Sequence, residues 1–336
     1  MKRTLILFAA SMAAILSLNA CTLSLAGKPT PLPTQIILLA TPTAPPTVLP
    51  TPDLSILTPA QSLPTLAATP AASTVIPGAA AATGAPGAIL PGQPSGPYAV
   101  IHVGAGETLN VRSAPGTGAS VIATYSATST NVMRTGPSSN VNNVLWVQVI
   151  SPGGGNGWVN SAYLTEYVAP DTFCADGRVN SLLTNFGNAV RSSNGGTLAP
   201  LVSPLHGITV RLWRNGNAAV FDQAHAHWIF SSTYAHDWGA APGSGLATVG
   251  SIHAEVVPKW MDVFTGNYTL SCNSPQTGGA SYDTSWPAIY ANVNFYSLYK
   301  PGPAGNENSW RTLLVGVEYV QNHPYLFSVT QLQWEP

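Results

Sequence analysis

The chain has 336 residues, of which only 7% are Asp, Glu, Lys or Arg, and its formal net charge is −1. Nucleic-acid binding needs a dense face of Lys and Arg that neutralises phosphates, so this composition argues against a nucleic-acid partner. The length allows two domains, and the abundance of Gly and Pro beside Trp, Tyr and Val favours short strands and turns over long helices.

The N-terminal residues predict export. Lys2 and Arg3 precede an apolar stretch, residues 5–16, that is too short to span a bilayer comfortably. The stretch leads into Leu-Asn-Ala-Cys ending at Cys21, which resembles the lipobox of bacterial lipoproteins. The resemblance implies a signal peptide at 1–20, a diacylglycerol anchor on Cys21 and an extracytoplasmic position at the cell surface or in the periplasm. The alternative is an ordinary secretory signal with a chance cysteine.

Residues 21–97 are predicted to form a disordered linker. Between Cys21 and Glu107 the only formal charges are Lys28 and Asp53, and the segment is rich in Pro, Thr, Ala, Leu and Gly. Such proline density leaves too little apolar surface for a core and favours an extended chain of about 3.1 Å per residue. We expect a plain spacer that carries a domain into or through the cell wall.

Residues 98–168 are predicted to form a small all-β barrel, because short apolar alternations recur with turn residues between them. A long loop is expected at 137–143. The expected strands are 98–103, 109–112, 121–125, 132–134, 145–150 and 157–159.

Three sequence runs within this module resemble the bacterial SH3 (SH3b) domain. They are Leu-Asn-Val-Arg at 109–112 followed by Ser-Ala-Pro-Gly, Trp-Val-Gln-Val at 146–149, and Gly-Trp-Val-Asn-Ser-Ala-Tyr-Leu at 157–164. The resemblance implies a cell-wall targeting module that binds peptidoglycan glycan or peptide, or another envelope protein, without catalysis.

Binding of sugars and short peptides needs exposed aromatic faces beside hydrogen-bonding side chains. The candidate binding residues are Asn110, Arg112, Tyr125, Trp146 and Tyr163. In the alternative interpretation, Trp146 and Trp158 belong to the barrel core, and Asn110 and Arg112 only hold the first loop.

Residues 171–336 are predicted to form an α+β domain in which helices pack on a curled antiparallel sheet. Asp176 is placed to cap the first helix, and Arg-Asn-Gly-Asn at 214–217 predicts a tight hairpin with positive φ angles. The first expected helix runs from 179 to about 191, and two further helices are expected at 197–202 and 252–264. The expected strands are 207–213, 218–221, 291–299, 310–320 and 325–334.

The last strands are similar in order to the nuclear transport factor 2-like cone, especially residues 310–318, 325–329 and the terminal Gln333-Trp334. That resemblance implies strands that wrap around the helices and leave a pocket. Tryptophans and tyrosines here either line such a pocket for a small apolar or sugar-like ligand or complete the core.

The histidines do not predict a metal site. If Asp222 caps a helix, as the resemblance to the cone implies, His225 and His227 point apart, whereas on a strand they would share a face. The spacing to His236 or His253 matches no zinc signature. Adjacent residues that could act as an acid–base pair, such as His236 and Asp237, also point apart, because neighbouring side chains on a helix or strand face different directions. We expect no metal, no cofactor and no catalytic residue.

Cys174 and Cys272 are the cysteines other than Cys21. In an exported chain their even number predicts a disulfide between the first helix and a strand near 268–272. The rival interpretation makes Cys174 the nucleophile of a wall peptidase, but Phe-Cys-Ala-Asp-Gly at 173–177 lacks the Asp-Cys-Ser-Gly frame that such enzymes carry.

The sequence thus predicts a membrane-anchored lipoprotein, not an enzyme, that binds peptidoglycan or an envelope protein through its SH3b module and a further ligand or partner through its C-terminal domain. One alternative is a cell-wall-modifying hydrolase whose catalytic part is the C-terminal domain. Another is a structural protein in which neither domain takes a small molecule.

Overall fold

The structure is a computed structural model that describes residues 96–280, 282 and 284–335. The predicted signal peptide at 1–20, the lipidation site Cys21 and the linker up to residue 95 lie outside the described residues. Among the described residues no helix has the length and apolar composition needed to cross a bilayer.

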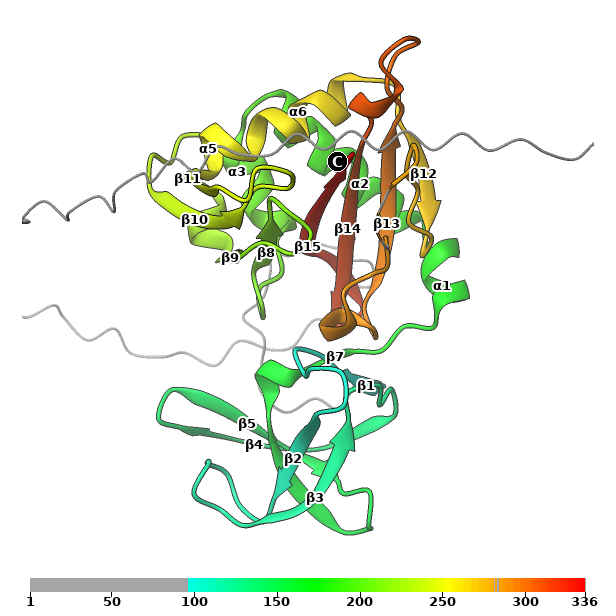
Figure 1. The fold of residues 1–336 in the computed structure, drawn as a ribbon. Helices are drawn as coiled ribbons and strands as arrows, with labels where there is room; N and C mark the ends of the chain where they lie inside the picture. Colours follow the sequence, from blue (N-terminus) through cyan, green and yellow to red (C-terminus); the bar gives the residue numbers. More distant parts are fainter. Residues whose placement is uncertain (1–95, 281, 283, 336) are drawn as a thin grey trace, which may run out of the picture. The chain divides into compact units, whose positions relative to one another are not determined.

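The first part of the described chain is a small barrel of short antiparallel strands (Figure 1). Alternation on β2 explains how it closes on a core: Leu109 and Val111 are buried while Asn110 between them is exposed. The strands are β1 (Pro97–Val100), β2 (Thr108–Arg112), β3 (Val121–Ser126), β4 (Val132–Val141), β5 (Val144–Ile150), β6 (Asn156–Asn160) and β7 (Leu164–Glu166).

The expected long loop at 137–143 is wrong. Strand β4 runs on to Val141 and pairs with β5 through a tight turn at Asn142 and Asn143, whose φ angles are +52° and +62°. Two consecutive left-handed residues are what a two-residue hairpin needs, and Asn adopts that conformation more readily than most residues. The departure from regular pairing lies instead at Gly136, inside a bulge between Arg134 and Ser138.

The second part of the described chain holds the remaining elements (Figure 1). Helices are few, and the two longest, α2 and α6, have 15 and 9 residues, so this region is a curled, mostly β structure. The helices are α1 (Pro170–Ala175), α2 (Gly177–Arg191), α3 (Gly195–Leu198), α4 (Gln223–Ala226), α5 (Ile252–Glu255) and α6 (Val257–Thr265). The strands are β8 (Ile208–Arg211), β9 (Ala218–Phe221), β10 (Ala235–Ala240), β11 (Ala247–Ser251), β12 (Thr269–Cys272), β13 (Asn294–Lys300), β14 (Arg311–Val320) and β15 (His323–Gln333).

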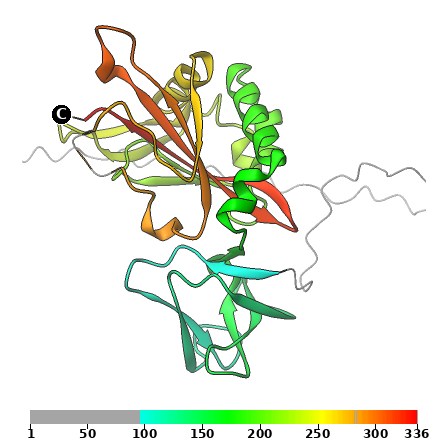
Figure 2. The same cartoon turned by 90° about the vertical axis from the view of Figure 1, so that its right-hand side faces the viewer.

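The sheet of this part has the order β12-β13-β14-β15-β8-β9. Neighbours pair antiparallel except β15 and β8, which are parallel. Helix α2 lies beside one face of the sheet (Figures 1 and 2), and α6 packs against α2. Strands β10 and β11 form a separate hairpin that the sequence did not predict.

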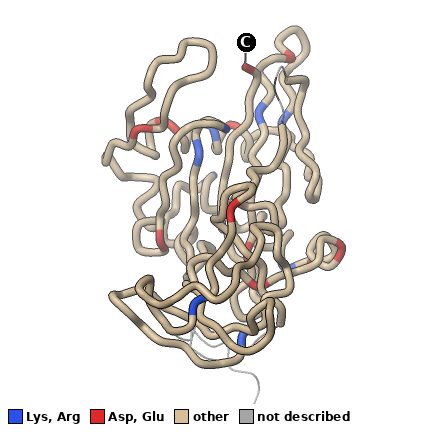
Figure 3. The backbone as a smooth tube through the Cα atoms, turned by 60° about the horizontal axis from the view of Figure 1, so that its bottom comes forward, with Lys and Arg blue, Asp and Glu red and all other residues tan. Residues whose placement is uncertain are grey.

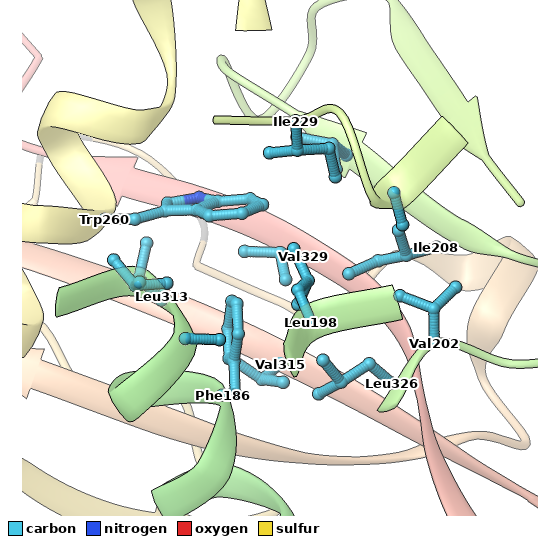
Figure 4. Packing of buried hydrophobic residues seen from close by; sticks show 14 of the residues in the cluster. Phe186, Leu198, Val202, Ile208, Ile229, Trp260, Leu313, Val315, Leu326 and Val329 are labelled. Carbon is cyan, nitrogen blue, oxygen red and sulfur yellow. The ribbon is translucent and has the colours of Figure 1, made fainter. Parts of the chain in front are cut away.

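Helices and sheet share one large hydrophobic core. Phe186 from α2 and Trp260 from α6 meet edge to face over Leu313 and Val315 of β14 (Figure 4). Trp238 and Trp260 are fully buried in this core, and Trp310 is fully buried in a separate cluster, so these tryptophans serve packing rather than line an open pocket.

Most local predictions for this part are confirmed. The Asp176 carboxylate caps α2 by accepting a hydrogen bond from the backbone N–H of Arg178 at 2.9 Å. The β14–β15 hairpin turns at Gln321 and Asn322, both with positive φ. The tight hairpin at 214–217 is wrong: the connection between β8 and β9 spans 212–217, and none of 214–217 has a positive φ.

A disulfide joins Cys174 at the end of α1 to Cys272 at the end of β12, with 5.8 Å between the two Cα atoms. The predicted pairing is therefore present, although α1 is a short helix that precedes the capped helix α2. The bond closes a loop across a sequence separation of 98 and fixes α1 to the edge strand of the sheet.

The barrel and the C-terminal region share buried contacts. Ile101 of the barrel lies in one cluster with Tyr290, Val293 and Phe327. Strand β7 is paired with β14 where Glu166 lies opposite Tyr319. These contacts fix the segment that follows β1, and that segment forms one side of the candidate site.

Candidate functional site

A groove of about 270 Å³ lies on the barrel beside the segment that follows β1. It draws residues from β2, β5, the end of β6 and the short 3-10 turn after β6. The residues that line it are His102, Val103, Glu107, Thr108, Leu109, Asn110, Arg112, Trp146, Asn160 and Tyr163.

Strand β2 presents Asn110 and Arg112 to the groove because alternate side chains of a strand share one face. The guanidinium of Arg112 donates from Nη1 to the backbone oxygen of Ala119 at 2.7 Å, which orients the side chain across the loop after β2. Its other donors make no side-chain hydrogen bond to the described residues, so they are available to a carboxylate or carbonyl oxygen of a ligand.

Trp146 and Tyr163 supply the aromatic surface. Trp146 is only 4% exposed, yet it lies outside the barrel's core cluster and lines the groove. Tyr163 is 36% exposed and ends the 3-10 turn at Ser161–Tyr163. Asn160 caps this turn, since its side-chain oxygen accepts from the N–H of Ala162 at 3.0 Å, and this bond positions Tyr163.

Charge in the groove is sparse and of both signs. Arg112 provides a cation and Glu107 an anion, whose carboxylate accepts from the backbone N–H of Gly104 at 3.1 Å. Burial, together with the charge of His206, lowers the pKa of His102, so this ring is neutral at pH 7. Figure 3 shows the charged residues of the described chain scattered along the backbone. The groove therefore suits a polar ligand with few charges.

The structure places Tyr125 apart from the other candidate residues. Its ring packs in the barrel core and is 8% exposed, and its hydroxyl donates to the backbone oxygen of Ile150. Burial raises the pKa of this phenol. Tyr125 lines a second hollow of about 390 Å³ with Met133 and Ser151. Asn110, Arg112, Trp146 and Tyr163 are the candidates that meet in the groove.

A comparison with known protein families finds a match within the barrel. Residues 107–165 match the bacterial SH3 domain. The match runs from just before β2 into β7, so β1 and Glu166 lie outside it. It includes these groove residues: Glu107, Asn110, Arg112, Trp146, Asn160 and Tyr163.

No curated protein and no solved structure matches the chain. The SH3 match ends before α1, so the similarity of the C-terminal region to the nuclear transport factor 2-like cone stays a prediction.

The histidines of the C-terminal region do not converge on a metal site. Asp222 caps α4 and also lies 2.7 Å from Nδ1 of His225, while His236 packs between aromatic rings of Phe221 and Tyr234. The described residues contain no group of three His, Cys, Asp or Glu side chains arranged to hold a metal ion.

The binding residues predicted from the sequence did not include His102, Glu107 or Asn160, which line the same groove. His102 has a positive φ of 59° and lies just after β1. Its ring stacks on Phe327 of β15 with 5.5 Å between centroids. That contact joins residues far apart in the chain, so no local pattern identifies it.

A buried ion pair lies behind His102. Nδ1 of His206 is 2.7 Å from Oε2 of Glu318, and the two side chains are 6% and 0% exposed. The hydroxyl of Thr165, from the barrel, donates to the same carboxylate oxygen at 3.0 Å. Burial disfavours the charged imidazole, but the charge of Glu318 and the hydrogen bond to it outweigh this penalty and raise the pKa of His206.

We expect stability to be greatest near the ordinary histidine pKa of 6.5. Above it the unfolded chain loses the proton that folded His206 retains, so stability falls as pH rises through the raised pKa of His206. Below it the unfolded chain gains protons that folded His102 and His236, whose pKa values are lowered, do not take up, so stability falls again. Urea denaturation from about pH 5 to about pH 8.5 measures both the loss of stability above pH 6.5 and the loss below it. His206→Phe should lose the alkaline decline, and a wild-type stability that rises between pH 6.5 and about pH 8.5 would contradict the assignment.

Proposed function

We propose that this chain is an exported, membrane-anchored lipoprotein whose bacterial SH3 domain binds peptidoglycan or another envelope component. Bacterial SH3 domains commonly bind cell-wall components, and residues 107–165 match that family. The lipid anchor is proposed from the sequence ending at Cys21, and it gives the protein an extracytoplasmic position. The C-terminal domain is proposed to bind a further ligand or partner.

The groove is the observation that carries this proposal. Peptidoglycan combines sugar rings with short peptides that bear amides, carboxylates and amino groups. An aromatic surface at Trp146 and Tyr163 suits the apolar faces of a sugar or peptide, and the side chains of Asn110 and Asn160 suit its amides and hydroxyls. Arg112 suits a peptide carboxylate.

We propose a binding role without catalysis. Hydrolysis of a wall peptide or glycan needs a nucleophile or a pair of acids near a bound substrate. Cys174 is held in the disulfide with Cys272, and Glu107 is the one carboxylate among the groove residues. Release of soluble wall fragments by the protein is the outcome that would favour the hydrolase alternative.

The curled sheet with α2 beside one face supports a cone-like C-terminal domain of the nuclear transport factor 2 type. We propose this architecture for the region that starts at 171. Its helix-facing side is filled by core side chains such as Phe186 and Trp260, so a ligand of this domain has to bind elsewhere on it.

Substitution of groove residues tests the binding proposal. Tyr163→Ala removes an exposed aromatic face and Arg112→Ala removes the cation, so each should weaken binding to isolated peptidoglycan by about tenfold or more. Co-sedimentation of the whole chain with purified peptidoglycan measures the affinity. The whole chain is used because Ile101 of the barrel is buried against Phe327 of the C-terminal region.

Met133→Ala is the matched control. Met133 is 42% exposed, comparable with Tyr163, and it lines the hollow around Tyr125. Its substitution should leave the affinity within about twofold. Equal losses for Met133→Ala and Tyr163→Ala would contradict the groove as the binding site, and absence of sedimentation for the wild type would contradict peptidoglycan binding.

A further inference from the structure

A further pocket lies in the C-terminal region, between β9, α4 and the start of β10. Its volume is about 320 Å³, at the lower end of the range typical of small-ligand pockets. It is lined by Val220, Phe221, His225, Trp228, Ile229, Ser232, Tyr234 and His236. No part of the match to the bacterial SH3 domain reaches it.

Two aromatic side chains of this pocket are unusually exposed. Trp228 is 60% exposed and Tyr234 is 71% exposed, whereas Trp238, Trp260 and Trp310 of the same region are fully buried. Exposing two large rings beside one concavity is unfavourable unless they meet a ligand or partner.

Each of the two rings packs edge-on against a histidine ring. Trp228 lies edge-on to the ring of His227 at 4.8 Å, and its backbone oxygen accepts from the N–H of Ser232 at 2.8 Å. Tyr234 lies edge-on to His236 at 4.9 Å. Preorganised rings lose little conformational freedom when a ligand stacks on them.

The polar groups of the pocket are two histidine rings and a serine hydroxyl. Nδ1 of His225 is engaged with Asp222, which leaves Nε2 for a ligand. The Ser232 hydroxyl accepts from the N–H of Tyr234 at 3.2 Å and keeps its own hydrogen to donate. Burial lowers the pKa of His236, so its ring is neutral at pH 7 and offers one donor and one acceptor.

No Lys, Arg, Asp or Glu is among the pocket residues. A charged ligand bound there would lose water without meeting a Lys, Arg, Asp or Glu side chain, which is costly. Hydroxyl groups around an apolar ring face match the pocket better, since aromatic side chains cover the face and the histidines and serine meet the edges.

We propose that this pocket binds an uncharged sugar ring, stacked on Trp228 and Tyr234 and hydrogen-bonded by His225, Ser232 and His236. A sugar of this kind is the ligand class that the proposed function leaves open for the C-terminal domain. The pocket is built from residues outside the SH3 groove, so either site can fail without the other.

Isothermal titration of the whole chain with neutral oligosaccharides tests the proposal. The probes are the trimer of N-acetylglucosamine, which represents wall glycan, and cellotriose, which represents glucose polymers. We expect saturable binding of at least one trimer, weakened about tenfold by Trp228→Ala and by Tyr234→Ala. Trp228→Phe keeps an aromatic face and should retain most of the affinity. The preferred trimer identifies the source of the sugar.

Two control substitutions show whether the sugar binds at this pocket. Leu246→Ala removes a 72% exposed apolar side chain outside the pocket and should leave sugar binding unchanged. Met133→Ala, in the hollow around Tyr125, should also leave it unchanged. Absence of binding for both trimers, or equal affinity of wild type and Trp228→Ala, would overturn the proposal. So would sedimentation velocity showing that Trp228→Ala separates a dimer, because the rings would then cover a second copy of the chain.

Discussion

Replacement of Glu318 by alanine is expected to lower the free energy of unfolding by about 3–5 kcal/mol, because it leaves the buried imidazole of His206 without its counter-charge. Glu318 is also the acceptor for Thr165, so the hydroxyl contributed by the barrel loses its partner. Urea denaturation of the whole chain, followed by tryptophan fluorescence, measures the loss. It should be larger at about pH 6 than at alkaline pH, where His206 can release its proton.

A double variant tests whether the lost stability comes from the unpaired charge of His206. His206→Phe combined with Glu318→Leu replaces the ion pair by apolar groups, and this double variant should be more stable than Glu318→Ala alone. Glu318→Gln keeps acceptors for Thr165 and should fall between wild type and Glu318→Ala. A loss below about 1 kcal/mol for Glu318→Ala would contradict a structural role for the pair.

Loss of the disulfide is expected to lower the free energy of unfolding by about 2–5 kcal/mol, since the bond closes a long loop and so restricts the unfolded chain. The change is Cys174→Ala with Cys272→Ala, which removes the bond without leaving a free thiol. Cys174 is exposed, so a reductant can reach the bond in the wild-type protein.

Reductant supplies the control for this second prediction. Dithiothreitol should lower the urea midpoint of the wild type to that of the double variant and should not change the midpoint of the double variant. Equal midpoints of the wild type with and without reductant would show that the bond does not stabilise the fold.

Local patterns predicted those parts of the fold that depend on neighbouring residues. The Asp176 cap and the alternation on β2 both follow from side-chain chemistry within a few positions. The alternation also places Asn110 and Arg112 on one face. These features need no knowledge of the rest of the chain.

Features that depend on distant contacts were not predicted. His206 and Glu318 are 112 residues apart, and their pairing depends on the sheet that brings β14 beside the barrel. The β10–β11 hairpin was also not predicted, because its strands, Ala235–Ala240 and Ala247–Ser251, are rich in Ala and Gly and carry little β-branched sequence.

The residues of the candidate groove were likewise predicted only in part from the local sequence. Trp146 resembles a core residue because it is apolar and lies in an apolar strand, yet its face of β5 turns away from the core cluster that contains Val147 and Val149. Register decides which face a strand residue occupies, and a shift of one position reverses it. Tyr125, which was predicted as a binding residue, lies on the core face instead.

The most direct test of the central claim is a nuclear magnetic resonance titration of the whole chain with soluble peptidoglycan fragments. The reporters are the indole N–H of Trp146 and the side-chain amides of Asn110 and Asn160, assigned by substituting each residue in turn. We expect these signals to shift together and saturably, and Tyr163→Ala to weaken the effect. Shifts confined to residues around Tyr125 and Met133, with the groove signals unchanged, would contradict peptidoglycan binding in the groove.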